Sequence, residues 1–396
     1  MATKRNVTSN APAAEDISIS NKAVIDEAIE RNWEIPNFTI KEIRDAIPAH
    51  CFRRDTFRSF THVLHDIIIM PILAIGASYI DSIPNTYARI ALWPLYWIAQ
   101  GIVGTGVWVI GHECGHQAFS PSKTINNSVG YVLHTALLVP YHSWRFSHSK
   151  HHKATGHMSK DQVFVPSTRK EYGLPPREQD PEVDGPHDAL DEVPLLSCIA
   201  CSFNLPLAGL FISSPMSLVK ITPVGLLIST PSVLSTIENQ FWDVMSSTAG
   251  VLGMIGFLAY CGQVLALLLS SSTMLFPYLN VNFWLVLITY LQHTDPKLPH
   301  YRENVWNFQR GAALTVDRSY GFLLDYFHHH ISDTHVAHHF FSTMPHYHAE
   351  EATVHIKKAL GKHYHCDNTP VPIALWKVWK SCRFVEDEGD VVFFKN

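Results

Sequence analysis

Several features of common protein classes are missing from this sequence. Residues 1–20 are polar, so no apolar segment marks an amino-terminal signal peptide. The seven cysteines follow no framework, and their odd number argues against a disulfide-stapled secreted fold. A formal net charge of -5 provides no basic surface for nucleic acid. Charged residues make up only 16% of the chain, against about 25% in average soluble domains.

The apolar residues gather into long runs, at about residues 61–80, 88–110, 247–269 and 274–292. Each run approaches the ~20 residues that a helix needs to cross the hydrocarbon core of a bilayer. We therefore predict an all-α polytopic membrane protein with about four transmembrane helices in two hairpins. Arg53, Arg54 and Arg58 precede the first run, so the positive-inside rule places both termini in the cytosol.

Polar segments between the runs divide the chain into parts. Residues 1–20 are expected to be disordered, because they are rich in small and polar residues. Thr39 and Glu42 have the spacing of a capping box at a helix start. The segment "VGYVLHTALLVP" is too short to span the bilayer, and we expect it to be interfacial or re-entrant. The remaining parts are cytosolic helices at 21–60, a first transmembrane hairpin at 61–110, a cytosolic segment at 111–195, a membrane region with the second hairpin at 196–292, and a cytosolic region at 293–396.

The 25 histidines are unusually numerous, and eight of them form three regular clusters. Box one is "HECGH", box two is "HSKHH" and box three is "HVAHH". Spacings of i, i+3 and i+4 place the imidazoles of each box on one face of a helix. The eight residues are His112 and His116, then His148, His151 and His152, then His335, His338 and His339. One tetrahedral zinc ion needs three or four protein ligands, so eight imidazoles fit two metal ions.

Box one also has the H-E-x-x-H pattern of zinc peptidases, in which Glu113 would be the general base. That interpretation leaves boxes two and three without a role. Imidazole also suits iron, and open positions on iron suit oxygen chemistry. Two irons with O2 can take hydrogen from an unactivated methylene, which no side chain can do. We therefore favour a histidine-bound diiron site at the cytosolic face, acting on an apolar substrate from the membrane.

The segments around the boxes resemble the membrane-bound fatty acid desaturases, in particular their fungal Δ12 branch. These segments are "HECGHQAFS", "WRFSHSKHHKATGHM", "YLQHTDPKLPHY", "TVDRSYG" and "DTHVAHHFFSTMPHYHAEEAT". The resemblance implies an oxidoreductase of the endoplasmic reticulum membrane that converts an oleoyl chain, on a phospholipid or other carrier, to linoleoyl. It further implies two iron ions, O2 as co-substrate, and electrons from NADH through cytochrome b5 and its reductase. The chain contains no "HPGG" haem motif, so we expect cytochrome b5 to be a separate partner.

The resemblance also implies roles for individual residues. The eight box histidines match the iron ligands of the family, and His293 is expected to be a ninth. Glu113 and Asp333 flank ligands and are expected to accept hydrogen bonds from imidazole N–H groups. His346, in "PHYH" with His348, is expected to have an orienting or a structural role. In the run "HHH" at 328–330, His328 stands where the family has Phe, and we interpret the run as surface variation.

The resemblance stops at about Cys198 and resumes at "ENQFWDV". Residues 215–231 read "PMSLVKITPVGLLISTP", and one permitted set of their codons, shifted by one base, encodes NVSGQDYPSWASHFNT, which is like the family segment. We infer that 198–236 comes from a shifted reading frame. Alternatives to a Δ12 desaturase are therefore an inactive chain, an ω3 or bifunctional Δ12/ω3 desaturase, or a fatty acid hydroxylase.

The carboxyl end of the chain reads "VVFFKN". It loosely resembles aromatic retrieval signals of the endoplasmic reticulum. A frayed tail is the other interpretation, and it is the one we favour.

Overall fold

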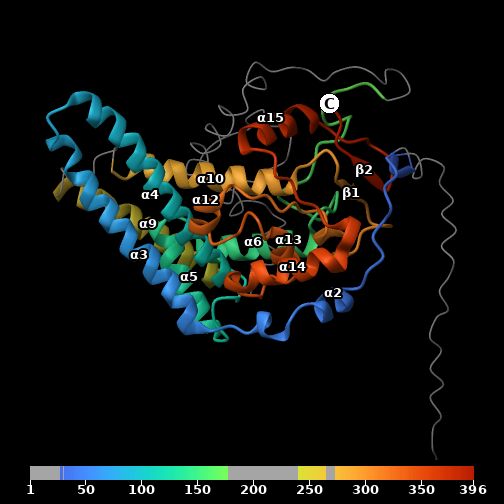
Figure 1. Ribbon diagram of the computed structural model, residues 1–396, viewed down its shortest axis with the longest axis horizontal. Helices are drawn as coiled ribbons and strands as arrows, with labels where there is room; N and C mark the ends of the chain where they lie inside the picture. Colours follow the sequence, from blue (N-terminus) through green and yellow to red (C-terminus); the bar gives the residue numbers. More distant parts are fainter. Residues whose placement is uncertain (1–26, 30, 177–239, 265–272) are drawn as a thin grey trace, which may run out of the picture.

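A computed structural model describes residues 27–29, 31–176, 240–264 and 273–396, and most of them are helical (Figure 1). The long helices are α3 (Thr56–Ser78), α4 (Thr86–Gly115), α9 (Phe241–Val264) and α10 (Leu275–His293). The shorter α-helices are α2 (Ile40–Ala46), α5 (Lys123–Ala136), α6 (Tyr141–Ala154), α11 (Phe308–Ala312), α12 (Phe322–Phe327), α13 (His335–Phe340), α14 (Ala349–Leu360) and α15 (Val371–Ser381). The 3-10 turns are η1 (Ala49–Phe52), η2 (Ile80–Ser82), η5 (His346–His348) and η6 (Gly361–His363). The predicted disorder of 1–20 and the frame-shifted segment 198–236 lie outside the described residues.

Three helices of the described part of the chain are long and apolar enough to cross a membrane, at 56–82, 86–115 and 241–262. The first two contain the predicted runs 61–80 and 88–110. The fourth predicted crossing folds as α10 but is not among these three helices. Asn280 and Asn282 interrupt its apolar sequence, and it packs closely on α4. The described residues therefore support a mostly helical protein with three candidate spans, and the fourth crossing remains a prediction.

Helices α3 and α4 form a hairpin, because η2 reverses the chain between them. Each helix begins at a polar cap: Asp55 accepts a hydrogen bond from the Arg58 N–H, and Asn85 accepts one from the Ala88 N–H. Ile72 on α3 and many other large apolar side chains of α3, α4 and α9 are exposed. Such apolar outer surfaces are what a lipid environment would cover.

The short helices and a small sheet gather beside one end of the long helices (Figure 1). The half of α4 from Gln100 to Cys114 is buried there, packed against α5, α6, α10 and α12. The capping box is confirmed, because Thr39 and Glu42 exchange hydrogen bonds at the start of α2. The short apolar segment before box two belongs to α5 and to the turn that follows it. Its buried side packs on α4, which brings the end of α4 next to α6.

The all-α prediction is incomplete, because a two-stranded antiparallel sheet joins β1 (Pro299–Tyr301) to β2 (Val391–Phe393). The frayed tail was also a wrong prediction, since β2 and Phe394 are almost fully buried. Valine and phenylalanine favour strands, and these side chains fill two apolar clusters of the core. The burial of both phenylalanine rings leaves no exposed aromatic signal at this end.

Candidate metal centre

Box one lies at the end of the buried half of α4. His112 is in the last turn of the helix and His116 is its C-cap, and the two Nε2 atoms are 3.3 Å apart. The chain turns away immediately afterwards, where Gln117 has a positive φ of 62°. Both imidazoles therefore project from the end of one long, supported helix.

Box two lies on α6, whose histidines face two directions. The Nε2 atom of His148 is 2.9 Å from that of His112 and 3.0 Å from that of His152. His151 instead approaches His293, with 3.4 Å between their Nε2 atoms. Neighbouring residues on a helix point about 100° apart, so His151 and His152 reach different groups.

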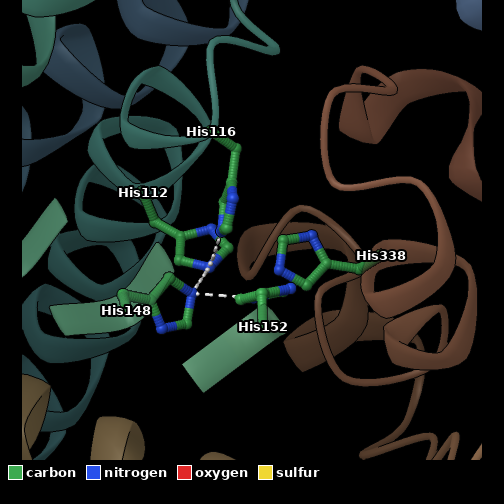
Figure 2. A group of neighbouring side chains, drawn as sticks. All are labelled: His112, His116, His148, His152 and His338. Carbon is green, nitrogen blue, oxygen red and sulfur yellow. Dashed lines mark hydrogen bonds between the residues drawn. The ribbon is translucent and has the colours of Figure 1, made fainter. Parts of the chain in front are cut away.

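Box three lies on the short helix α13. His338 joins the histidines of α4 and the first face of α6 (Figure 2). His339 joins His151 and His293, and His335 lies on the same side, with its Nε2 3.0 Å from that of His293. The nine predicted ligands thus come together as two adjoining groups. The five-histidine group contains His112, His116, His148, His152 and His338, and the four-histidine group contains His151, His293, His335 and His339.

The spacing of these nitrogens fits metal ligands. With bonds of about 2.1 Å, two imidazole nitrogens on one metal lie about 3.0 Å apart at octahedral angles and about 3.4 Å apart at tetrahedral angles. The separations above, from 2.9 to 3.4 Å, fall in this range. The Nε2 atoms of His338 and His339 are buried and have no hydrogen-bond partner. A metal ion would satisfy these nitrogens.

Burial also keeps the imidazoles in the form that binds metal. It lowers the pKa values of His148, His152 and His338 well below the ordinary range, and neighbouring imidazoles add to the effect. The pKa of His116 falls to about 3 for the same reason. Neutral imidazole has a free lone pair, so the site presents ligands at physiological pH.

Glu113 lies behind the imidazoles of the five-histidine group. Its Oε1 is 3.6 Å from His112 Nδ1 and 3.8 Å from His338 Nδ1, and its Oε2 accepts a hydrogen bond of 3.1 Å from the backbone N–H of His346. The carboxylate is thus on the Nδ1 side of these two rings. That position suits a group that orients ligands better than a general base.

Asp161 is an orienting carboxylate that the sequence did not reveal. Its Oδ1 is 2.9 Å from His151 Nδ1, and both side chains are buried. Burial raises the pKa of Asp161, but the neighbouring His151 imidazole outweighs this, and the net pKa is lowered. Asp161 is ten residues beyond His151 in a loop, so no helical spacing pointed to it. It performs the role expected of Asp333, whose Oδ2 lies 3.0 Å from His330 Nδ1.

Two further features hold the boxes in place. Asp317, within the "TVDRSYG" segment, accepts a hydrogen bond of 2.7 Å from the Val336 N–H at the start of α13 and one of 2.6 Å from the Tyr364 hydroxyl. Burial raises the pKa of Asp317 to about 7. Trp144 stacks on His148, with ring centroids 4.6 Å apart. The sequence patterns indicated none of these contacts.

The run at 328–330 is not surface variation, as predicted. His328 is fully buried against Trp284, and His329 is nearly so. Burial lowers the pKa of His328 to about 3, so it is neutral there. His346 lies beside His329, where its ring contacts that of His62.

Comparison with known proteins is consistent with this arrangement. A family model described as "Fatty acid desaturase" matches residues 91–369, and one described as "Domain of unknown function" matches residues 4–75. The chain is 53% identical to a Delta(12) fatty acid desaturase of Mortierella isabellina, over 93% of both chains. An omega-6 fatty acid desaturase, endoplasmic reticulum, of Brassica juncea is 41% identical over 90% of this chain and 89% of that protein. An oleate hydroxylase of Claviceps purpurea is 38% identical over 91% of this chain and 81% of that protein.

Proposed function

Because the chain belongs to the fatty acid desaturase family, we propose that it is a Δ12 desaturase that converts an oleoyl chain to a linoleoyl chain. The reaction removes two hydrogens from the C12–C13 bond, while O2, two electrons and two protons yield two waters. The convergence of nine histidines into a group of five and a group of four supports this proposal most strongly. The identity of 53% to the Mortierella enzyme, against 38% to the hydroxylase, favours desaturation over hydroxylation.

Two iron ions would be held by these groups, one in each. Bound there with O2, they supply an oxidant that is strong enough to take hydrogen from an unactivated methylene. Nine neutral nitrogen ligands from four helices suit iron, and two adjacent sites fit a reaction that removes two hydrogens from neighbouring carbons.

The chain's own residues orient these ligands and exclude water. Asp161 fixes the ring of His151, because its carboxylate accepts from Nδ1 and leaves Nε2 to face the four-histidine group. Glu113 lies against the Nδ1 atoms of His112 and His338 in the same sense. Trp108 and Trp144, both buried, cover the outer faces of His112 and His148.

The surroundings of the site support the partners of the proposed reaction. Three candidate spans carry large exposed apolar surfaces, which suits an enzyme that takes an oleoyl phospholipid or acyl chain from the bilayer. We place it in the endoplasmic reticulum membrane, in line with the printed name of the Brassica relative. Both termini would be cytosolic, and electrons would come from NADH through cytochrome b5 and its reductase.

The test is a fatty acid profile by gas chromatography–mass spectrometry. A yeast that makes oleate but no linoleate would express this chain and, separately, a version with the reading frame of 198–236 restored. Linoleate from both supports the proposal, and linoleate from the restored version alone assigns the activity to the family sequence but not to this chain. Hydroxyoleate, an ω3 double bond or an unchanged profile in both strains would refute Δ12 desaturation.

A further inference from the structure

A third group of histidines lies outside the nine discussed above. His62 is on α3, His329 follows α12, and His346 begins η5. One ligand nitrogen from each of the three lies within 4.8 Å of the others. We call this group the α3 triad. Its members come from three separate parts of the chain, so no sequence spacing could have indicated it.

The rings of the α3 triad are spaced like those of an iron group. Their centroids are 4.6, 5.1 and 5.5 Å apart. The corresponding separations between His151, His293 and His339 are 4.6, 4.8 and 5.3 Å. The triad therefore needs no larger adjustment to hold a metal ion than the four-histidine group does.

One nitrogen of the triad has no partner. His346 has a side chain that is only 9% exposed, and its buried Nε2 makes no hydrogen bond. A buried polar atom without a partner is costly and is usually satisfied by an unseen group. Because His62 and His329 surround this ring, a ligand for Nε2 would also lie near their nitrogens.

A buried carboxylate completes the arrangement. Asp66, one turn after His62 on α3, has its Oδ2 2.8 Å from His329 Nε2 and its Oδ1 2.8 Å from His65 Nδ1. Carboxylates that hold one ring nitrogen of a histidine, while the other binds metal, are typical of zinc sites. Asp66 also balances the positive charge of Arg58, whose guanidinium lies over the neighbouring Tyr347 ring.

The backbone adopts an unfavourable conformation to bring His329 here. His329 and His330 have positive φ values of 51° and 59°, a region that residues with side chains rarely occupy. The loop can approach α4 only because residue 106 is glycine, since a Cβ there would lie 2.4 Å from the Phe327 carbonyl oxygen. Strained residues held this way cluster at functional sites.

We propose that His62, His329 and His346 bind a zinc ion, separate from the two irons. Zinc is commonly held by three histidines with a fourth position left for water, and it undergoes no redox chemistry of its own. The ion would tie α3, the first candidate span, to the loops that flank box three. It would thereby fix the position of η5, whose first residue donates its backbone N–H to Glu113.

The metal content of the purified full chain tests this proposal. The protein would be produced with iron and zinc in the medium, washed with a mild chelator, and measured by inductively coupled plasma mass spectrometry. We expect about one zinc per chain in addition to iron. The double variant His62→Gln/His329→Gln should lose the zinc and keep the iron. The control His330→Gln changes the next residue of the same loop, which pairs with Asp333, and should keep both metals.

Three results would overturn the proposal: zinc at background in the unchanged chain, zinc that persists in the double variant, or iron and zinc lost together. If the double variant folds poorly, the single variant His62→Gln should still lower the zinc content and not the iron. Linoleate production by the unchanged chain is a separate readout. Linoleate without zinc would reject only the third site, and zinc without linoleate would reject only the proposed function.

Discussion

His152 and His339 stack face to face, with ring centroids 4.1 Å apart and planes 10° from parallel. His152 belongs to the five-histidine group and His339 to the four-histidine group. The stack is therefore the common wall of the two groups. It places them close enough to act on one substrate chain, and it joins α6 to α13 by direct contact.

Loss of a ligand from either group should abolish the activity. We expect His338→Ala, in the five-histidine group, and His335→Ala, in the four-histidine group, each to lower iron from about two per chain to about one or fewer. Linoleate should fall by more than the about 10–100-fold that removing an orienting partner typically costs. Iron analysis and fatty acid profiles would measure both. His50→Ala is the control, because this half-exposed residue pairs with Glu351 away from both groups; equal loss in the control would contradict the assignment.

Asp161 and Asp333 can be distinguished by matched substitutions. Asp161→Asn should weaken iron retention by about 10–100-fold, because the His151 ring loses the carboxylate that orients it. Asp333→Asn should change iron retention little, because its closest ring partner is His330. The rate of iron loss to a chelator would measure the difference. A larger effect from Asp333 would restore the role that the sequence suggested for it.

The packing of α10 on α4 depends on small residues. A Cβ at Gly101 would lie 2.5 Å from the Cβ of Asn280, and one at Gly104 would lie 2.8 Å from Val281 Cγ2. Gly101→Val should therefore lower the free energy of unfolding by about 1–3 kcal/mol through overpacking. Gly253→Ala on α9 is the control, since nothing lies within 4 Å there and alanine favours a helix. Thermal unfolding in detergent would compare them, and equal melting temperatures would argue against the close approach.

The carboxyl strand should contribute to stability. Phe393 is buried in β2, so Phe393→Ala should lower the free energy of unfolding by about 3–5 kcal/mol. Asn396→Ala, at an exposed position, should have no effect. Melting temperatures of the two variants would settle the matter. No loss of stability in Phe393→Ala would mean that the end of the chain is frayed after all.

Local patterns carried much of the sequence-based prediction. The long helices appear where apolar runs reach membrane length, and the cap at Thr39 forms because both partners are three residues apart. The histidine boxes share helical faces because i, i+3 and i+4 spacing is a property of any helix. The family resemblance added His293 to the expected ligands, and its ring lies within the four-histidine group.

The errors came from contacts between distant segments. The "HHH" run has no periodicity that indicates burial, and it is covered only because its loop docks on α4 at Gly106. The strand at Val391–Phe393 needs its partner at Pro299–Tyr301, nearly ninety residues earlier. The asparagines of α10 look unsuited to a spanning helix, yet they lie where α10 meets α4.

The sequence by itself determined which residues are available as ligands and which segments are apolar enough for a membrane. Both are properties of short stretches, set by residue type and spacing. Only the tertiary structure decided which metal group each histidine joins, as with His151 and His152, and that Asp161 orients one of them. It also assembled the α3 triad from three separate segments. Such partnerships depend on how helices pack against one another, and no local pattern records that.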